Sequence, residues 1–267
     1  GTVRNYEQGL TRVAEWTQQE RLSGGLRAMT PVLAIRYLEQ RGQTVGQKAL
    51  DMERQALQAM MQHVTGQLAA GERIPVIKSE QAQVLTARAY TAPQVALIAA
   101  AQTPRHGLAT ELAYAAGLRA HELLTLRRGE ERAADPRPAL ASKWQGRNGV
   151  IYTVHGKGGL VREVLLPHAL AERLEAVRLD APLAITDRGI HYQSHYDIGG
   201  GQRWSNSVSA ASERALGWST GAHGLRHSYA QERMAELQAS LSRDAALTTV
   251  SQEMGHFRPE ITETYLR

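Results

Sequence analysis

The first seventy residues repeat apolar side chains at the spacing of an α-helix. In the first predicted helix these residues are Leu10, Val13 and Trp16. Thr30-Pro31 offers an N-cap followed by proline at the first helical position, so a second helix is expected from there to Gly42. A third segment, capped by Thr44, repeats apolar residues at three- and four-residue steps and ends at Gly71. The pattern predicts a small helical N-terminal domain.

The helical periodicity stops between Glu72 and Tyr90. Pro75 lacks a backbone donor and restricts the residue before it, so this stretch cannot form a regular helix, and we expect a linker. Thr91-Ala92-Pro93 then restarts a helical pattern, and the apolar positions up to Leu118 predict two short helices. The chain is therefore expected to divide into two domains, 1–85 and 91–267.

A change of pattern in the second domain predicts a β-hairpin. Residues 150–154 are rich in β-branched side chains, and residues 161–165, Val-Arg-Glu-Val-Leu, are interpreted as an alternating strand. The Gly-rich turn at 155–159 joins them. After Pro167 the pattern is mostly helical again, except at 186–204, where we expect a loop or an inserted hairpin. The predicted fold is mainly α with one small antiparallel sheet.

Composition narrows the class of protein. The 267 residues hold 31 Lys and Arg against 26 Asp and Glu, a net charge of +5, which permits a polyanionic partner but does not identify one. Cysteine is absent, which excludes a disulfide scaffold, a thiolate zinc site and a cysteine nucleophile. The longest apolar run, at 95–101, is far shorter than the roughly 20 residues that span a bilayer. No signal peptide is visible at the start, so we expect a soluble, cytoplasmic protein without a membrane partner.

Two motifs place basic residues where they could meet an anion. If Gly117 to Leu124 is helical, Arg119 and Glu122 share a face, and Glu122 could orient the Arg119 guanidinium toward a phosphate. Lys157 lies between glycines at the tip of the predicted hairpin, where the backbone can approach a ligand closely. Alone, the first motif is typical of a surface ion pair and the second of an ordinary turn.

Two further motifs lie near the end of the chain. A helix that starts at His223 puts Arg226 one turn away, and both residues would lie at an end of a helix that favours anions. Gly255 ends another helix and is followed by His256, while Tyr265 lies near the end of the helix that Pro259 opens. Each motif by itself is typical of a capped helix or of a core tyrosine.

Taken in order, these motifs closely resemble the tyrosine recombinase (phage integrase) family. The family pattern is Arg-x-x-Glu-Leu, Gly-Lys-Gly between two strands, His-x-x-Arg-His, and Gly-His with Tyr nine residues later. The matching positions are Arg119, Lys157, His223, Arg226, His256 and Tyr265. The resemblance covers about 91–267, whereas 1–85 resembles the core-binding domain of the family only in size, helicity and position.

The resemblance implies a mainly helical catalytic domain at 91–267 and a helical, DNA-binding core-binding domain at 1–85. It also implies a reaction, in which DNA strands are cleaved and rejoined through a 3′-phosphotyrosine on Tyr265. Because an unperturbed tyrosine has a pKa of ~10, this nucleophile needs nearby cations and a base at neutral pH. Site-specific recombination is the implied function, with integration or excision of a mobile element as the preferred role.

Each matched residue has an implied role. Arg119 and Arg226 would bracket the non-bridging phosphate oxygens, as metal ions do in many nucleases. His223 would be the base, Lys157 would protonate the leaving 5′ oxygen, and His256 would donate a hydrogen bond to the phosphate. Outside the matched set, Glu122 would hold Arg119 in place.

The resemblance implies no metal ion, no ATP and no other cofactor. The implied partner is double-stranded DNA at specific recombination sites, held by a homotetramer on two duplexes. Family members usually continue beyond the tyrosine with a segment that docks on a neighbouring protomer, whereas this sequence ends at Arg267. Either the chain is trimmed or its assembly differs.

Three other interpretations are open. A type IB topoisomerase shares most of the set but typically has lysine at the position of His223. A DNA-binding architectural protein could keep the fold without the activity, although all six positions are filled here. A metal site could use His191 and His195, four residues apart, but no third ligand is evident in the sequence.

Overall fold

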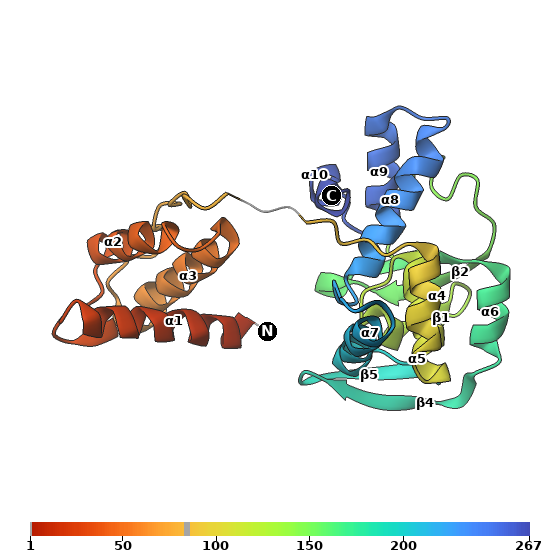
Figure 1. Cartoon of the computed structure of the whole chain (residues 1–267), viewed down its shortest axis with the longest axis horizontal. Helices are drawn as coiled ribbons and strands as arrows, with labels where there is room; N and C mark the ends of the chain where they lie inside the picture. The colour runs from red at the N-terminus through yellow and green to blue at the C-terminus, as the bar shows by residue number, and fades with distance from the viewer. Residues whose placement is uncertain (1, 83–85) are drawn as a thin grey trace. The chain divides into compact units, whose positions relative to one another are not determined.

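A computed structural model describes residues 2–82 and 86–267, without the side chains of Thr2 and Lys157. The chain forms two compact units, residues 1–85 and 86–267 (Figure 1). Among the described residues, no helix is both long enough and apolar enough to cross a membrane.

The N-terminal unit is helical, as predicted. Its helices are α1 (Thr2–Gln19), α2 (Pro31–Gly42) and α3 (Gln47–Met60), with short helical turns at Gly25–Ala28 and Met61–Thr65. The Thr30 side chain caps α2 by accepting a hydrogen bond from the backbone N–H of Leu33. The prediction for the third helix is too long. That helix starts after Gly46, and the helical turn that extends it stops before Gly66, whose φ of +67° is left-handed.

A buried carboxylate ties the three N-terminal helices together. Glu53 of α3 is 2% exposed and accepts two hydrogen bonds from Arg41, at 3.0 and 2.9 Å, and one from the Tyr37 hydroxyl at 2.7 Å. Arg12 of α1 lies 3.5 Å away. A charge is tolerated in such a core because its partners satisfy it.

The expected linker at 72–90 is much shorter in the structure. Ile74 is 2% exposed and belongs to the core of the N-terminal unit, and the Ser79 hydroxyl donates to the Val45 carbonyl at 2.6 Å. Toward the other end, the Tyr90 backbone N–H donates to Ser228 at 2.8 Å, and Arg88 donates to the Thr220 carbonyl at 2.9 Å. Both ends of the segment are therefore attached to a unit.

The larger unit is mainly helical with two small antiparallel sheets, which confirms the predicted fold class. Its longer helices are α4 (Ala92–Ala100), α5 (Pro104–Ala116), α6 (His168–Glu175), α7 (Gly201–Leu216), α8 (Gly224–Gln238) and α9 (Arg243–Glu253). Two short pieces, α10 (Pro259–Thr262) and a 3-10 turn at Glu263–Tyr265, end the chain. The two short helices predicted before Leu118 are α4 and α5.

The predicted hairpin is present as part of a three-stranded sheet in the order β1-β2-β3. The strands are β1 (Arg127–Arg128), β2 (Val150–His155) and β3 (Val161–Leu166). In β3 every second residue is buried, namely Arg162, Val164 and Leu166. One of the three inward positions of this strand therefore carries a charge.

A second hairpin lies where helix was partly expected. Its strands are β4 (Arg178–Asp187) and β5 (Ile190–Tyr196), so it begins eight residues before the stretch that the sequence marked as irregular. The sequence of β4 does not alternate apolar and polar residues, and it contains Pro182, which is tolerated on an edge strand. Asp187 at the tip accepts a hydrogen bond from the backbone N–H of Gln202, in the first turn of α7, at 2.8 Å.

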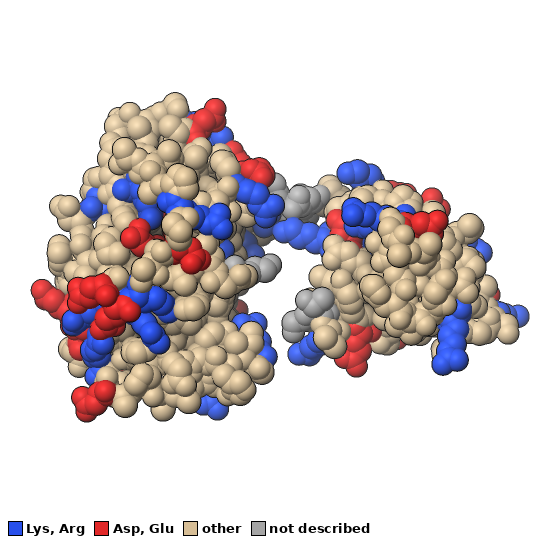
Figure 2. Space-filling model, turned by 180° about the vertical axis from the view of Figure 1, so that it is seen from behind, with Lys and Arg blue, Asp and Glu red and all other residues tan. Residues whose placement is uncertain are grey.

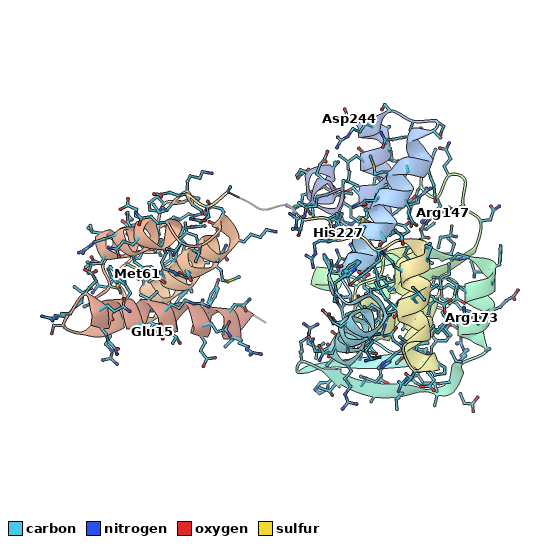
Figure 3. The ribbon with its side chains drawn as sticks, viewed as in Figure 1. Glu15, Met61, Arg147, Arg173, His227 and Asp244 are labelled. Atoms are coloured by element: carbon cyan, nitrogen blue, oxygen red, sulfur yellow. The ribbon has the colours of Figure 1, made fainter. Side chains whose placement is uncertain are left out.

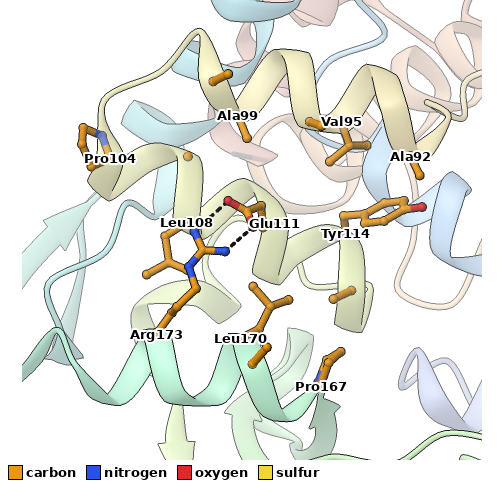
Figure 4. Close-up of a pocket in the computed structure, with 15 residues that line it drawn as sticks. Ala92, Val95, Ala99, Pro104, Leu108, Glu111, Tyr114, Pro167, Leu170 and Arg173 are labelled. Carbon is orange, nitrogen blue, oxygen red and sulfur yellow. Dashed lines mark hydrogen bonds and ion pairs between the residues drawn. The ribbon is translucent and has the colours of Figure 1, made fainter.

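Helices α4, α5 and α6 border an apolar cavity of about 720 Å³ (Figure 4). Val95, Leu108 and Leu170 line it, and an ion pair between Arg173 and Glu111 crosses its edge. None of the residues that match the recombinase pattern lines this cavity. The candidate chemistry is therefore elsewhere in the unit.

Candidate active site

Arg119 and Glu122 are in contact, but not on an α-helix as expected. Gly117, with a φ of +58°, ends α5, and a 3-10 turn spans Glu122–Thr125. Within this turn Glu122 reaches back, so that its Oε1 accepts from Arg119 Nη1 at 2.7 Å and its Oε2 from the Arg119 backbone N–H at 2.8 Å. The Arg119 side chain remains 19% exposed. Its Nε and Nη2 make no hydrogen bond to a described residue, so they are available to a ligand.

Glu122 is fully buried beneath three guanidiniums. Its Oε2 accepts a hydrogen bond from Arg162 Nη2 at 2.7 Å and lies 3.9 Å from Arg226 Nη1. Burial alone would raise the pKa of Glu122, but the charges of Arg162, Arg226 and Arg119 outweigh it and hold the pKa far below its usual range. The carboxylate therefore stays ionised and keeps the guanidiniums together.

Arg162 of β3 is a site residue that the sequence did not reveal. It is 4% exposed, and besides bonding Glu122 its Nη1 donates to the Glu253 carbonyl at 2.7 Å, at the end of α9. It passes directly beside Gly255, where an added Cβ would lie 2.5 Å from Arg162 Cδ. The signal was a charge at an inward position of a strand whose other inward residues are Val164 and Leu166.

The predicted helix start at His223 is confirmed, since His223 is the N-cap of α8. Arg226, one turn further, is completely buried. Its Nη1 donates to the carbonyl of Gly117, and its Nη2 lies 3.0 Å from His256 Nε2. Burial and the charge of Arg119 lower the pKa of Arg226 to about 10, so it remains a cation at neutral pH.

One donor of Arg226 lacks an acceptor. Its Nε is buried without a hydrogen-bond partner among the described residues. A buried, unpaired donor of a charged group is costly, typically about 1–3 kcal/mol or more. An added anion in this place would be favoured because it supplies the missing acceptor.

Tyr265 lies among imidazole rings and over Arg226. Its ring centroid is 5.2 Å from that of His223, 4.9 Å from His227 and 5.0 Å from His256. The Arg226 guanidinium carbon is 5.5 Å from the same ring. Although Tyr265 is only 7% exposed, its hydroxyl is neither hydrogen-bonded to a described residue nor fully buried. The phenol oxygen is therefore available for chemistry.

Helix α8 also holds the main chain of the tyrosine segment. His227 Nδ1 lies 3.2 Å from the Tyr265 carbonyl oxygen, and Gln231 Nε2 donates to the carbonyls of Tyr265 at 3.1 Å and Arg267 at 2.9 Å. His227 lies on the side of α8 that faces the C-terminal segment (Figures 1 and 3). The same helix thus carries Arg226 and positions Tyr265.

The three histidines of the site are neutral at neutral pH. Burial, followed by the charge of Arg226, lowers the pKa of His256 to about 3 and lowers that of His223 as well. Burial and the charge of Arg88 lower the pKa of His227 to about 4. His256 Nδ1 lies 3.0 Å from the Thr262 hydroxyl, which helps to fix the ring. The rings are free to accept a proton, but at so low a pKa each is a weak base until a bound phosphate, as a nearby negative charge, raises it.

The structure places the backbone of Lys157 where it was predicted, but it does not support a metal site at His191 and His195. Lys157 lies in the turn between β2 and β3, as expected, but its side chain is outside the described part of the chain. His191 and His195 lie on strand β5 rather than in a loop, which puts them about 13 Å apart along the strand. They are too far apart to share one metal ion, and no group of three possible ligands occurs among the described residues.

Searches with the sequence find no match to any family model and none among curated proteins. Solved structures do match. A XerH site-specific recombinase bound to its palindromic difH substrate has a TM-score of 0.61 at 16% identity, covering 99% of this chain and 76% of that one. The Tn1549 transposon integrase in complex with transposon right end DNA gives 0.55 at 14%, covering 98% and 89%. A lambda integrase dimer bound to a core site gives 0.56 at 16%, covering 100% and 88%.

At these identities the likeness concerns the fold. All three neighbours are recombinases or integrases that share one architecture with this chain over nearly its whole length. The chain therefore has the tyrosine recombinase fold that the sequence resemblance implies.

Proposed function

We propose that this protein is a tyrosine site-specific recombinase that cleaves and rejoins DNA strands. The observation that carries the proposal is that Arg119 and Arg226 meet at the buried Glu122, and that the Tyr265 ring lies beside Arg226. Arg119 lies more than a hundred positions before Arg226 and Tyr265 in the sequence, yet the three are linked through these contacts. The fold shared with DNA-bound recombinases supports the same function.

Two guanidiniums suit a phosphodiester that gains negative charge in its transition state. Arg119 is partly exposed, and Arg226 has a donor without an acceptor. Together they would bind the non-bridging oxygens, and Glu122 would fix their positions. His256 Nε2 accepts from Arg226 Nη2, so His256 would donate a further hydrogen bond to the phosphate once a phosphate oxygen takes that Arg226 donor and the ring proton lies on Nε2.

The proposed cleavage step is an attack of the Tyr265 phenol oxygen on phosphorus. The new bond joins this oxygen to phosphorus, and the bond between phosphorus and the 5′ oxygen breaks. His223 accepts the phenol proton, and Lys157 supplies a proton to the leaving 5′ oxygen. The product is a 3′-phosphotyrosine and a free 5′ hydroxyl.

Rejoining is the reverse reaction. Because the phosphotyrosine conserves the bond energy, a 5′ hydroxyl of another duplex can attack it and release Tyr265 without ATP. The partner would be double-stranded DNA at specific sites, bound by a homotetramer on two duplexes. Integration or excision of a mobile element is the role we favour.

The proposal is tested with nicked suicide duplexes in which the sequence around the nick is randomised. After cleavage the short 5′ fragment diffuses away, so a covalent adduct accumulates and is visible on a denaturing gel. We expect the wild-type protein to form the adduct, and Tyr265→Phe to bind the duplex without forming it. Tyr192→Phe, whose hydroxyl makes no hydrogen bond to a described residue, is the matched control and should keep full adduct yield.

The other outcomes separate the alternatives. An undiminished adduct with Tyr265→Phe would refute the assignment of the nucleophile. Binding without any adduct from the wild-type protein would favour an architectural protein. Relaxation of supercoiled plasmid without sequence preference would favour a type IB topoisomerase.

A further inference from the structure

The charged surface does not identify a DNA-binding face by itself. On the face shown in Figure 2, Lys and Arg side chains stand beside Asp and Glu side chains in mixed groups. Paired charges such as these contribute little attraction for a polyanion. The informative residues are the arginines of the larger unit that have no acidic partner.

Strand β1 contains two arginines, of which one has acidic partners and the other has none among the described residues. Arg128 lies opposite Tyr152 and forms ion pairs with Glu175 and Glu130. Arg127 lies opposite Thr153, on the other face of the sheet. Its partly exposed side chain forms neither a hydrogen bond nor an ion pair with any residue that the structure describes, and none of its nitrogens is buried. Arg127 is therefore an uncompensated cation.

Arg132 lies beside Arg127 and is held rigidly. Its Nε donates to the Thr153 hydroxyl at 2.9 Å, and its Nη2 donates to the carbonyls of Thr125 at 2.6 Å and Thr153 at 2.7 Å. All three acceptors are uncharged. Nη1 has no partner within the described chain and is not buried. Burial and the nearby charge of Arg127 lower the pKa of Arg132 to about 10, which leaves it charged at neutral pH.

The neighbouring ionisable groups do not neutralise these two arginines. Burial and the two guanidiniums lower the pKa of His155, and burial with Arg127 lowers that of His195, so neither histidine is a cation at neutral pH. The two carboxylates that act on these histidines, Asp135 and Glu131, form no ion pair with Arg127 or Arg132 among the described residues. Asp135 accepts a hydrogen bond from the Val161 backbone N–H, and Glu131 pairs with Arg178.

The two arginines lie close to the candidate active site. Thr125, whose carbonyl binds Arg132, also donates its hydroxyl to the Glu122 carbonyl at 2.9 Å. The 3-10 turn Glu122–Thr125 therefore links Glu122 to the two arginines. The backbone path from Glu122 to Arg127 is on the order of 10 Å. A single DNA duplex can contact both places, because it carries phosphates every ~3.4 Å along each strand.

We propose that Arg127 and Arg132 form a second phosphate site, which binds the DNA backbone beside the cleaved position. This inference rests on the proposed function, because it takes DNA as the substrate. Two guanidiniums without a carboxylate partner suit a phosphate, to which arginine can donate two parallel hydrogen bonds. Such a contact carries no sequence information, so the site would fix the register of the duplex and add to affinity for any DNA.

The test measures how DNA binding depends on salt. Each phosphate contact by a cation adds about 0.9 to the slope of log affinity against log salt concentration. The affinity of full-length protein for a labelled duplex of mixed sequence is measured by fluorescence anisotropy between about 50 and 200 mM salt. We expect Arg127→Gln to lose one contact, so its affinity should fall about 3.5-fold less over this range than that of the wild type.

Arg128→Gln is the matched control, because it removes the same charge from the adjacent, ion-paired position. We expect its slope to equal that of the wild type. Equal slopes for Arg127→Gln and the wild type would overturn the inference, and so would an equal change in both variants. A wild-type protein that binds no duplex and forms no Tyr265 adduct would overturn the proposed function as well. One that binds and cleaves, with an unchanged Arg127→Gln slope, would overturn the second site alone.

Discussion

The state of one buried carboxylate decides the geometry of the candidate site. Glu122 meets the positive charges of three arginines, and Arg162 makes the closest contacts apart from those of Arg119. Since Glu122 is fully buried, its negative charge is stable only while these partners remain. Its protonation would release Arg119 from a fixed position.

This dependence makes a prediction for Arg162→Gln. Loss of the nearest buried guanidinium leaves burial as the dominant effect, so the Glu122 pKa should rise. Cleavage by the variant should fail as the pH is lowered through that raised pKa and recover at higher pH. In the wild-type protein Glu122 stays ionised over the same pH range, so cleavage should not show this loss. We also expect the free energy of unfolding to fall by about 3–5 kcal/mol, the usual effect of breaking a buried ion pair.

The measurements are suicide-duplex cleavage rates against pH and urea denaturation. Arg162→Lys keeps the charge and should keep the wild-type pH profile. Lys143→Gln removes a neighbouring, more exposed ion pair with Glu163 and should change stability by less than about 1 kcal/mol. If the cleavage rate of Arg162→Gln falls at low pH no earlier than that of the wild type, the role given to Arg162 is contradicted.

The turn after α9 is tightly packed against the site. Gly255 has a φ of +71°, and a side chain there would meet Arg162. The same turn carries the Met254 carbonyl, 3.3 Å from Arg226 Nη2, and His256. A small shift of the backbone in this turn would therefore displace Arg162, Arg226 and His256.

We expect Gly255→Ala to lower the free energy of unfolding by about 2–4 kcal/mol. Left-handed backbone costs an alanine about 1–2 kcal/mol, and the close contact with Arg162 adds a packing penalty. Gly217→Ala, at a φ of +77° with open space around it, should show the backbone cost alone. Urea denaturation of both variants measures the difference, and equal losses would show that the Arg162 contact is not strained.

The elements that could be predicted from the sequence are those with a local pattern. Thr30-Pro31 and the β-branched run at 150–154 depend on neighbouring residues alone, and both predictions are confirmed. Strand β4 was missed because Pro182 and the lack of alternation hide a strand that is defined by its pairing with β5. Arg162 was missed because its partners Glu122 and Glu253 lie far away in sequence. Long-range pairing, unlike periodicity, leaves little trace in a single sequence.

The two units have separate cores. The described core residues of the N-terminal unit run from Val13 to Ile74, and those of the larger unit begin at Tyr90. All residues of the candidate site belong to the larger unit. Each unit has its own buried polar centre, Glu53 in one and Glu122 in the other.

We therefore predict that residues 86–267 fold alone. The fragment should show cooperative thermal unfolding by circular dichroism, because its core needs no residue of the first unit. It should also form the Tyr265 adduct on the suicide duplex that the full chain cleaves, since it contains every matched position. A fragment that is unfolded would contradict the division into two independent cores.

The contacts between α8 and the C-terminal segment have a consequence for any assembly of this chain. His227 and Gln231 hold the main chain of Tyr265 on the helix that carries Arg226 of the same molecule. Under the proposed function, each molecule thus brings its own nucleophile to its own phosphate site. A damaged copy within a mixed assembly would lose only its own cut, while its neighbours would go on cutting their strands.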